Sequence, residues 1–263
     1  MKSLRGIARS LVVGATIMGV MGSGASRAAD AVGRGSAEES PTLQQARRLV
    51  AEIRNEIREA ESEIRNHPYL AALEDGQISR DNLRAFAGEQ YNIIRSDLRS
   101  EALLLSRFGA SRSARPFFGD LLAGETQALD LLLRFAAALG LDEEDLAAYE
   151  PRPMGQAYPS YVAWLASFGN QADVAASFLV NFAVFGENTG RMATALRDRY
   201  GLTSEQVAFF EFFAAPVPGF EEAALAVIAE GLEQGAEPRL VKRSARLLQA
   251  YEGEFWDAVS QEP

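Results

Sequence analysis

The chain contains 263 residues, of which 48% are hydrophobic and 24% are charged, and its formal net charge is -10. This length and hydrophobic content predict one or two globular domains, while the negative charge argues against a nucleic-acid partner because phosphate groups bind to basic surfaces. The sequence has no cysteine and a single histidine, His67. These features exclude a thiolate nucleophile and a cysteine-ligated or histidine-rich metal site, so we expect no metal or other cofactor.

Residues 1–29 differ in composition from the rest of the chain. Three basic residues, Lys2, Arg5 and Arg9, come first. An apolar run from Leu11 to about Met21 follows, and small residues come after it. This order is typical of a secretory signal peptide, and the run is shorter than the roughly 20 residues that span a membrane. We predict a signal peptide over 1–29, a flexible linker over 30–42 and no stable membrane insertion once the leader is removed.

The leader also decides the predicted location of the protein. If the leader is a signal peptide, the protein is exported to the periplasm or the extracellular space. A transit peptide and a start codon placed too early are the alternatives. Without a signal peptide, the protein would be cytoplasmic.

From residue 43 onward, apolar residues recur at helical spacing, and neither an alternating strand pattern nor an internal repeat is present. The segment 43–67 has the pattern of one long amphipathic helix. Capping residues, glycines and prolines divide the remainder into further helices. Their main segments are expected over 80–108, 113–140, 158–169, 171–201, 203–214, 220–235 and 237–260. We predict an all-α bundle of about seven or eight helices over residues 43–263, in which the apolar stretch from Val174 to Phe185 is buried.

Polar residues within apolar helix segments are the candidates for a functional site, because a buried polar group destabilises the fold unless it is paired. Four such residues are Glu89, Asn181, Glu187 and Glu252, and Tyr158, at an expected helix entrance, could add a hydroxyl group. Carboxylates gathered in a dry cavity have raised pKa values and can act as general acids or bases. Several of them could also hold two metal ions in a helical bundle.

Each candidate also has a purely structural interpretation. Glu89 is flanked by residues that are not apolar and could be exposed. Glu187 lies near two glycines, where the helix could be loosened and hydrated, and Asn181 could be a core amide paired with a neighbouring helix. His67, directly before a proline, is typical of a helix start.

Several motifs resemble those of one known family. The stretch "NHPYLAALEDGQISRDNLRAFAGEQY" at 66–91 is similar to an HPF-x-x-x-[IL]-x-DG-x-L motif and the helix after it. The similarity continues through "AALGL", "PRPMGQAYPSYVAWLASFGNQADVAASFLVNFAVFGE" and the terminal "YEGEFW", and it covers about 43–259. On these motifs the chain resembles the TenA family of thiaminase II-type enzymes in the TENA/THI-4/PQQC group. The resemblance implies a heme-oxygenase-like helical bundle, commonly assembled as a homotetramer.

The same resemblance assigns roles to residues of this chain. Glu252 matches the family's catalytic acid in a Glu-x-x-Phe-Trp motif, and Tyr158 matches a pocket tyrosine. The family's nucleophilic cysteine falls on Asn181, whose amide cannot replace a thiolate. Two further pocket tyrosines of the family fall on Phe185 and Phe213.

Family members that lack the cysteine are thought to use glutamates, so the resemblance implies that Glu252 and Glu89 are catalytic, one protonated and one ionised. Glu187 is the other candidate for the second acid. The family's substrate-binding aspartate falls on Gln90, next to Glu89, and a nearby tyrosine falls on Ile93. The predicted substrate-binding residues are Tyr158, Asn181, Gln90, Phe185, Phe213 and Glu187.

Two functions of different classes follow from these residues. The first is a TenA-like protein that handles a thiamin-related aminopyrimidine, a small heterocyclic ligand, and hydrolyses it through paired glutamates. The second is a catalytically inactive TenA-like module that binds a small aromatic ligand or a protein partner. A di-iron oxidase of the same fold is less favoured, because its His-x-x-x-Asp-x-x-His run falls on Phe213, Val217 and Phe220. A heme oxygenase would need His67 as its axial ligand.

Overall fold

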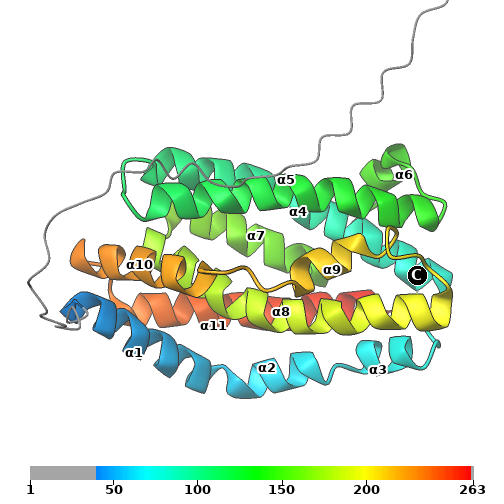
Figure 1. Cartoon of the computed structure of the whole chain (residues 1–263), viewed down its shortest axis with the longest axis horizontal. Coiled ribbons are helices and arrows are strands. Elements are labelled where there is room, and N and C mark those ends of the chain that lie inside the picture. Colours follow the sequence, from blue (N-terminus) through cyan, green and yellow to red (C-terminus); the bar gives the residue numbers. More distant parts are fainter. Residues whose placement is uncertain (1–39, 262–263) are drawn as a thin grey trace, which may run out of the picture. The chain divides into compact units, whose positions relative to one another are not determined.

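Residues 40–261 are described by a computed structural model, and within that range the chain is helical with no β-strand. The predicted signal peptide over 1–29 and most of the predicted linker lie outside the described residues. The described range forms eleven helices (Figure 1). They are α1 (Pro41–Glu56), α2 (Arg58–Arg65), α3 (Pro68–Glu74), α4 (Arg80–Phe108), α5 (Ala114–Ala138), α6 (Glu143–Ala148), α7 (Pro153–Phe168), α8 (Gln171–Tyr200), α9 (Ala208–Ala214), α10 (Phe220–Glu233) and α11 (Pro238–Ser260). The prediction of an all-α fold is confirmed.

The helices outnumber the prediction partly because the long helix expected over 43–67 is two helices, α1 and α2. The segment 43–67 is divided at Ile57, where the backbone leaves the helical region at φ -94° and ψ 2°. Ile57 stays buried, so the apolar spacing continues across the break and gives no sign of it. The short helix α3 begins at His67, whose Nδ1 accepts a hydrogen bond from the Tyr69 N–H at 3.2 Å, and α6 begins with a capping box at Asp142.

Helix α7 begins earlier than the sequence suggests. Pro153 occupies its first turn, where a residue without an N–H is tolerated, and Pro159 lies inside the helix. Tyr158 therefore lies within α7 rather than at a helix entrance, and its side chain is buried.

The long helix α8 packs chiefly against α9, α10 and α11 (Figure 1). α4 lies beside α5, α8 lies beside α11, and α7 packs against both α4 and α11. α9 and α10 pack along α8, while α1, α2 and α3 contact α10, α11 and α8 (Figure 1). The predicted burial of the stretch from Val174 to Phe185 is interrupted only at Phe182 and Ala183. None of the helices in the described range is both long enough and apolar enough to cross a membrane.

Candidate active site

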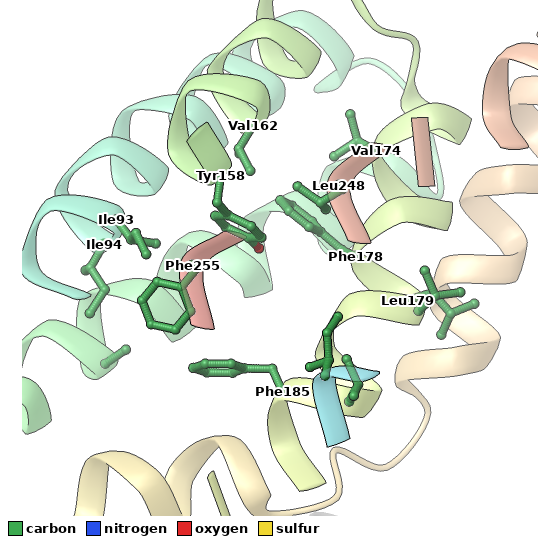
Figure 2. Close-up of a cluster of buried hydrophobic side chains, with 14 of the residues drawn as sticks. Ile93, Ile94, Tyr158, Val162, Val174, Phe178, Leu179, Phe185, Leu248 and Phe255 are labelled. Carbon is green, nitrogen blue, oxygen red and sulfur yellow. The ribbon is translucent and has the colours of Figure 1, made fainter. Parts of the chain in front are cut away.

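A small cavity lies between α4, α5, α7, α8, α9 and α11. The centre of a water molecule can occupy a volume of about 30 Å³ in it. That volume corresponds to about two waters. The apolar walls are Ile93, Ile94, Phe182, Phe185, Phe213 and Phe255. The polar lining consists of Gln90, Asp97, Glu125, Tyr158, Asn181 and Glu252. Figure 2 shows how Tyr158, Phe185 and Phe255 approach one another from three different helices.

Glu252 lines this cavity, and both of its carboxylate oxygens accept hydrogen bonds. Only 4% of its surface is exposed. Its Oε1 accepts a hydrogen bond from Trp256 Nε1 at 2.8 Å, one helical turn further along α11. Its Oε2 accepts from Asn181 Nδ2 at 3.2 Å. Burial raises the pKa of Glu252 to about 7, although both hydrogen bonds favour the ionised form. The carboxyl group can therefore both give and take a proton near neutral pH.

Asn181 and Tyr158 hold this carboxylate in place. The Tyr158 hydroxyl donates to Asn181 Oδ1 at 3.0 Å, so the Asn181 amide has one orientation, with Nδ2 facing Glu252. Burial raises the pKa of Tyr158 well above its ordinary value, and negative charge on the surrounding acids raises it further. Tyr158 thus remains a neutral hydrogen-bond donor, and the three residues form one continuous chain across α7, α8 and α11.

Two acids that sequence reasoning missed share the cavity with Glu252. Asp97 on α4 and Glu125 on α5 are both buried and both line it. Glu101, one turn beyond Asp97 on α4, is buried behind them. Burial raises the pKa of Asp97 well above its usual range, that of Glu125 to about 7 and that of Glu101 to about 10. Negative charge on Glu125 adds to the rise at Asp97 and Glu101.

The positions of these acids did carry a signal in the sequence. Asp97 and Glu101 continue the helical face that holds Gln90 and Ile94, and the same spacing reaches the buried Leu104. Residues three or four apart lie on one face of a helix, so the two acids belong to the buried side of α4. The sequence candidates come only from apolar helix segments, whereas Asp97 and Glu101 lie among charged residues.

Glu89, the predicted second catalytic acid, requires a correction. It is buried, but it does not line the cavity. Its Oε1 accepts hydrogen bonds from the Tyr149 hydroxyl at 2.9 Å and from the Arg152 N–H at 2.8 Å, both on the connection between α6 and α7. Adjacent residues on a helix point about 100° apart, so Gln90 faces the cavity and Glu89 faces this connection. A Cβ on Gly155 would lie 2.2 Å from Glu89 Oε2, which shows how closely α7 approaches the carboxylate.

Glu89 is therefore expected to stabilise the fold without taking part in binding. Replacement of Glu89 by alanine removes the acceptor of two hydrogen bonds and should lower the free energy of unfolding by about 1–3 kcal/mol. Urea unfolding of the variant measures this loss, and Tyr149→Phe, which removes one of the two donors, should show a smaller loss. A Glu89→Ala protein that keeps its stability but loses ligand binding would contradict this assignment.

Glu187 and His67 also lie away from the cavity. Glu187 is largely exposed, and its Oε2 pairs with Arg65 Nε at 2.5 Å, so it does not belong to the binding surface where the sequence placed it. His67 caps α3 and contacts Asp257 through Nε2 at 3.1 Å. The exposure of Glu187 follows from its place on the outer side of α8, whereas the interior face of the same helix carries Asn181 and Phe185.

Comparison with known proteins gives the family from the sequence and the fold from the structure. The model of the TENA/THI-4/PQQC family matches residues 54–262. An aminopyrimidine aminohydrolase from Halalkalibacterium halodurans is 28% identical over 114 residues, which cover 43% of this chain and 51% of that protein. The aligned part thus spans about half the length of this curated relative.

Solved structures resemble the described helices closely. A TenA homolog from Pseudomonas syringae has a TM-score of 0.72 at 14% identity, with 86% of this chain and 99% of that chain covered. A TenA homologue from Pyrococcus furiosus has a TM-score of 0.65 at 18% identity, with 80% and 99% covered. Heme oxygenase-1 from Synechocystis has a TM-score of 0.55 at 14% identity, with 80% and 90% covered. These similarities confirm the predicted heme-oxygenase-like fold.

Proposed function

The chain belongs to the TENA/THI-4/PQQC family, and from that premise we propose that it binds a thiamin-related aminopyrimidine in the cavity and hydrolyses a C–N bond of that ligand. The observation that supports this function best is the buried Glu252 carboxyl, held by two donors with its pKa raised to about 7. The similarity to an aminopyrimidine aminohydrolase over part of the chain supports the same reaction class.

The proposed reaction uses water in place of the cysteine that the chain lacks. The water oxygen forms a bond to the carbon that carries the amino group, and the bond from that carbon to nitrogen breaks. Glu252 accepts a proton from the water and returns one to the departing amine, so an amine and water become an alcohol and ammonia. Asn181 and Tyr158 contribute by fixing the orientation of the Glu252 carboxylate.

The size of the cavity sets a condition on ligand binding. An aminopyrimidine is larger than a space that holds about two waters, so side chains must move when it binds. Phe182 and Phe213 are the partly exposed members of the lining, and their outward rotation would open the cavity from the side of α8 and α9.

An inactive binding module is the competing function, and the apolar walls favour it. Ile93, Phe185 and Phe213 replace polar pocket residues expected from the family resemblance and would hold an aromatic ring without chemistry. The two functions separate in a turnover assay on the purified full chain. Hydrolysis should yield one ammonia for each hydroxylated pyrimidine formed, whereas saturable binding with no product would identify the binding module.

Substitution of Asn181 by aspartate tests whether the residue at this position affects the pKa of Glu252. A second carboxylate would stand where the Asn181 amide lies 3.2 Å from Glu252 Oε2. A like charge at this distance should raise the pKa of Glu252 and move the acidic limb of the kcat/KM profile up by about one pH unit or more. Tyr158→Phe removes the hydrogen bond to Asn181 without adding charge, so its profile should keep the wild-type pH dependence. Identical profiles for Asn181→Asp and wild type would show that Glu252 is not the titrating group.

A further inference from the structure

Three buried acids have no role in the proposed reaction. Asp97, Glu101 and Glu125 have exposed fractions of 5%, 1% and 8%. In the described part of the chain, no hydrogen-bond partner is present for Asp97 Oδ1, Glu101 Oε2 or Glu125 Oε2. Buried carboxyl groups without partners destabilise a fold, so the presence of Asp97 and Glu125 in the lining of a cavity indicates a ligand that supplies the missing partner.

The charge of the cavity restricts what that ligand can be. Asp97 and Glu125 line the cavity from α4 and α5, and Glu252 lines it from α11. Among the described residues of the lining there is no lysine, arginine or histidine. Because the lining supplies no cation, a ligand that brings both a positive charge and hydrogen-bond donors suits the unpartnered oxygens best.

We propose that Asp97 and Glu125 bind a protonated amine, so that the cavity takes an organic cation whose ammonium group is joined to an aromatic ring through a methylene group. The ring would lie between Phe185, Phe213 and Phe255, which are apolar and face the same space. The identity of the ring as an aminopyrimidine rests on the proposed function, but the preference for an ammonium group follows from the acids alone.

The arrangement of the carboxyl groups favours an ammonium ion over a metal ion. Within residues 40–261, no group of three or more acidic or histidine side chains is placed so that it could hold a metal ion. An ammonium group donates up to three hydrogen bonds in different directions, which suits oxygens that approach from separate helices. Asp97 and Glu125 come from α4 and α5, and each has one free oxygen.

Protons should leave the acids when the cation binds. The titratable groups that face one another here are Asp97, Glu101, Glu125, Tyr158 and Glu252. Burial raises the pKa of all five, so these carboxyl groups keep their protons to a higher pH than ordinary acids do. A positive charge beside Asp97 and Glu125 favours their ionised forms, and binding therefore releases protons to the buffer.

Matched ligand pairs test the proposal by isothermal titration calorimetry on the full chain. One pair is an aminopyrimidine with an aminomethyl substituent and its hydroxymethyl counterpart, and the other is benzylamine and benzyl alcohol. The wild type should bind each ammonium compound about tenfold or more tightly than its alcohol. The heat of binding should also change with the ionisation enthalpy of the buffer, as proton release requires.

Near-isosteric variants test whether Asp97 and Glu125 cause the preference for ammonium compounds over alcohols. Asp97→Asn and Glu125→Gln should each reduce the preference for the ammonium compound to about threefold or less, while binding of the alcohols stays unchanged. Because each variant replaces an unpartnered buried carboxyl group with a neutral amide, its melting temperature should not fall, and this measurement excludes unfolding as the cause. Equal affinity for amine and alcohol in the wild type, or a preference that persists in both variants, would overturn the proposal.

The two ligand pairs separate this proposal from the proposed function. Benzylamine binding that depends on Asp97 and Glu125, without any pyrimidine binding, would support the ammonium site and reject the aminopyrimidine. Tight pyrimidine binding without preference for the amine would support the aminopyrimidine and reject the ammonium site. Absence of binding by every compound would overturn both the ammonium site and the proposed function. Binding of Mg²⁺ or Mn²⁺ alone that both variants abolish would replace the ammonium site by a metal site.

Discussion

Replacement of Glu252 by glutamine is expected to lower kcat for aminopyrimidine hydrolysis by about 100-fold or more, because proton transfer by a positioned carboxyl contributes on that scale. Glutamine has the size of glutamate but neither gives nor takes a proton near neutral pH. Steady-state kinetics with detection of both ammonia and pyrimidine product measures the loss. The melting temperature should not fall, because the variant removes a buried group whose pKa is raised to about 7 by burial.

A control variant on the same helix tests whether the loss of activity is specific to the position of Glu252. Glu254 lies two residues after Glu252 and does not line the cavity. Glu254→Gln is therefore expected to keep wild-type kcat and KM. Equal kinetics for the two variants would contradict a catalytic role for Glu252.

Replacement of Glu101 by glutamine is expected to stabilise the protein. Glu101 is 1% exposed, and burial with nearby acids raises its pKa to about 10. In the unfolded chain the same group titrates near about 4.3, so near neutral pH folding must protonate it. Each pKa unit between the ambient pH and the unfolded value represents about 1.4 kcal/mol, which gives a stabilisation on the order of 3 kcal/mol for Glu101→Gln at about pH 7.

The pH dependence of the free energy of unfolding tests the sign of this stabilisation separately. Below about pH 4 the carboxyl is protonated in both states, so the variant should gain little. As the pH rises toward 10, the folded state retains a proton that the unfolded state has lost, and the wild type becomes progressively less stable than the variant. Urea unfolding at several pH values measures the difference, with the exposed Glu233→Gln as control. A gain that is independent of pH, or a loss at every pH, would contradict the burial of an acid at this position.

Helical spacing predicted the fold well because amphipathic periodicity and caps are local properties of a sequence. It could not show the break at Ile57, because the apolar spacing continues through it. It placed the start of α7 too late, since Pro153 and Pro159 both fit inside one helix.

The candidate site was predictable only where a resemblance or an apolar neighbourhood identified the residue. Glu252, Asn181 and Tyr158 stand among apolar residues, and the structure brings them together in one hydrogen-bonded chain. Asp97 stands among charged residues and Glu125 beside small and uncharged polar ones, and only the pairing of α4 with α5 shows that they face one cavity. Local spacing does not contain that information, because it depends on which helices become neighbours.

The proposed function requires the ligand to bind in this cavity. A crystal structure of the full chain with the hydroxymethyl aminopyrimidine product tests it most directly, because the product binds without reacting further. The ring is expected between Phe185 and Phe255 with a ring nitrogen at about 3 Å from a Glu252 oxygen, and with Phe182 or Phe213 displaced. A product molecule bound outside this cavity, or an unchanged cavity at saturating concentration, would contradict the account.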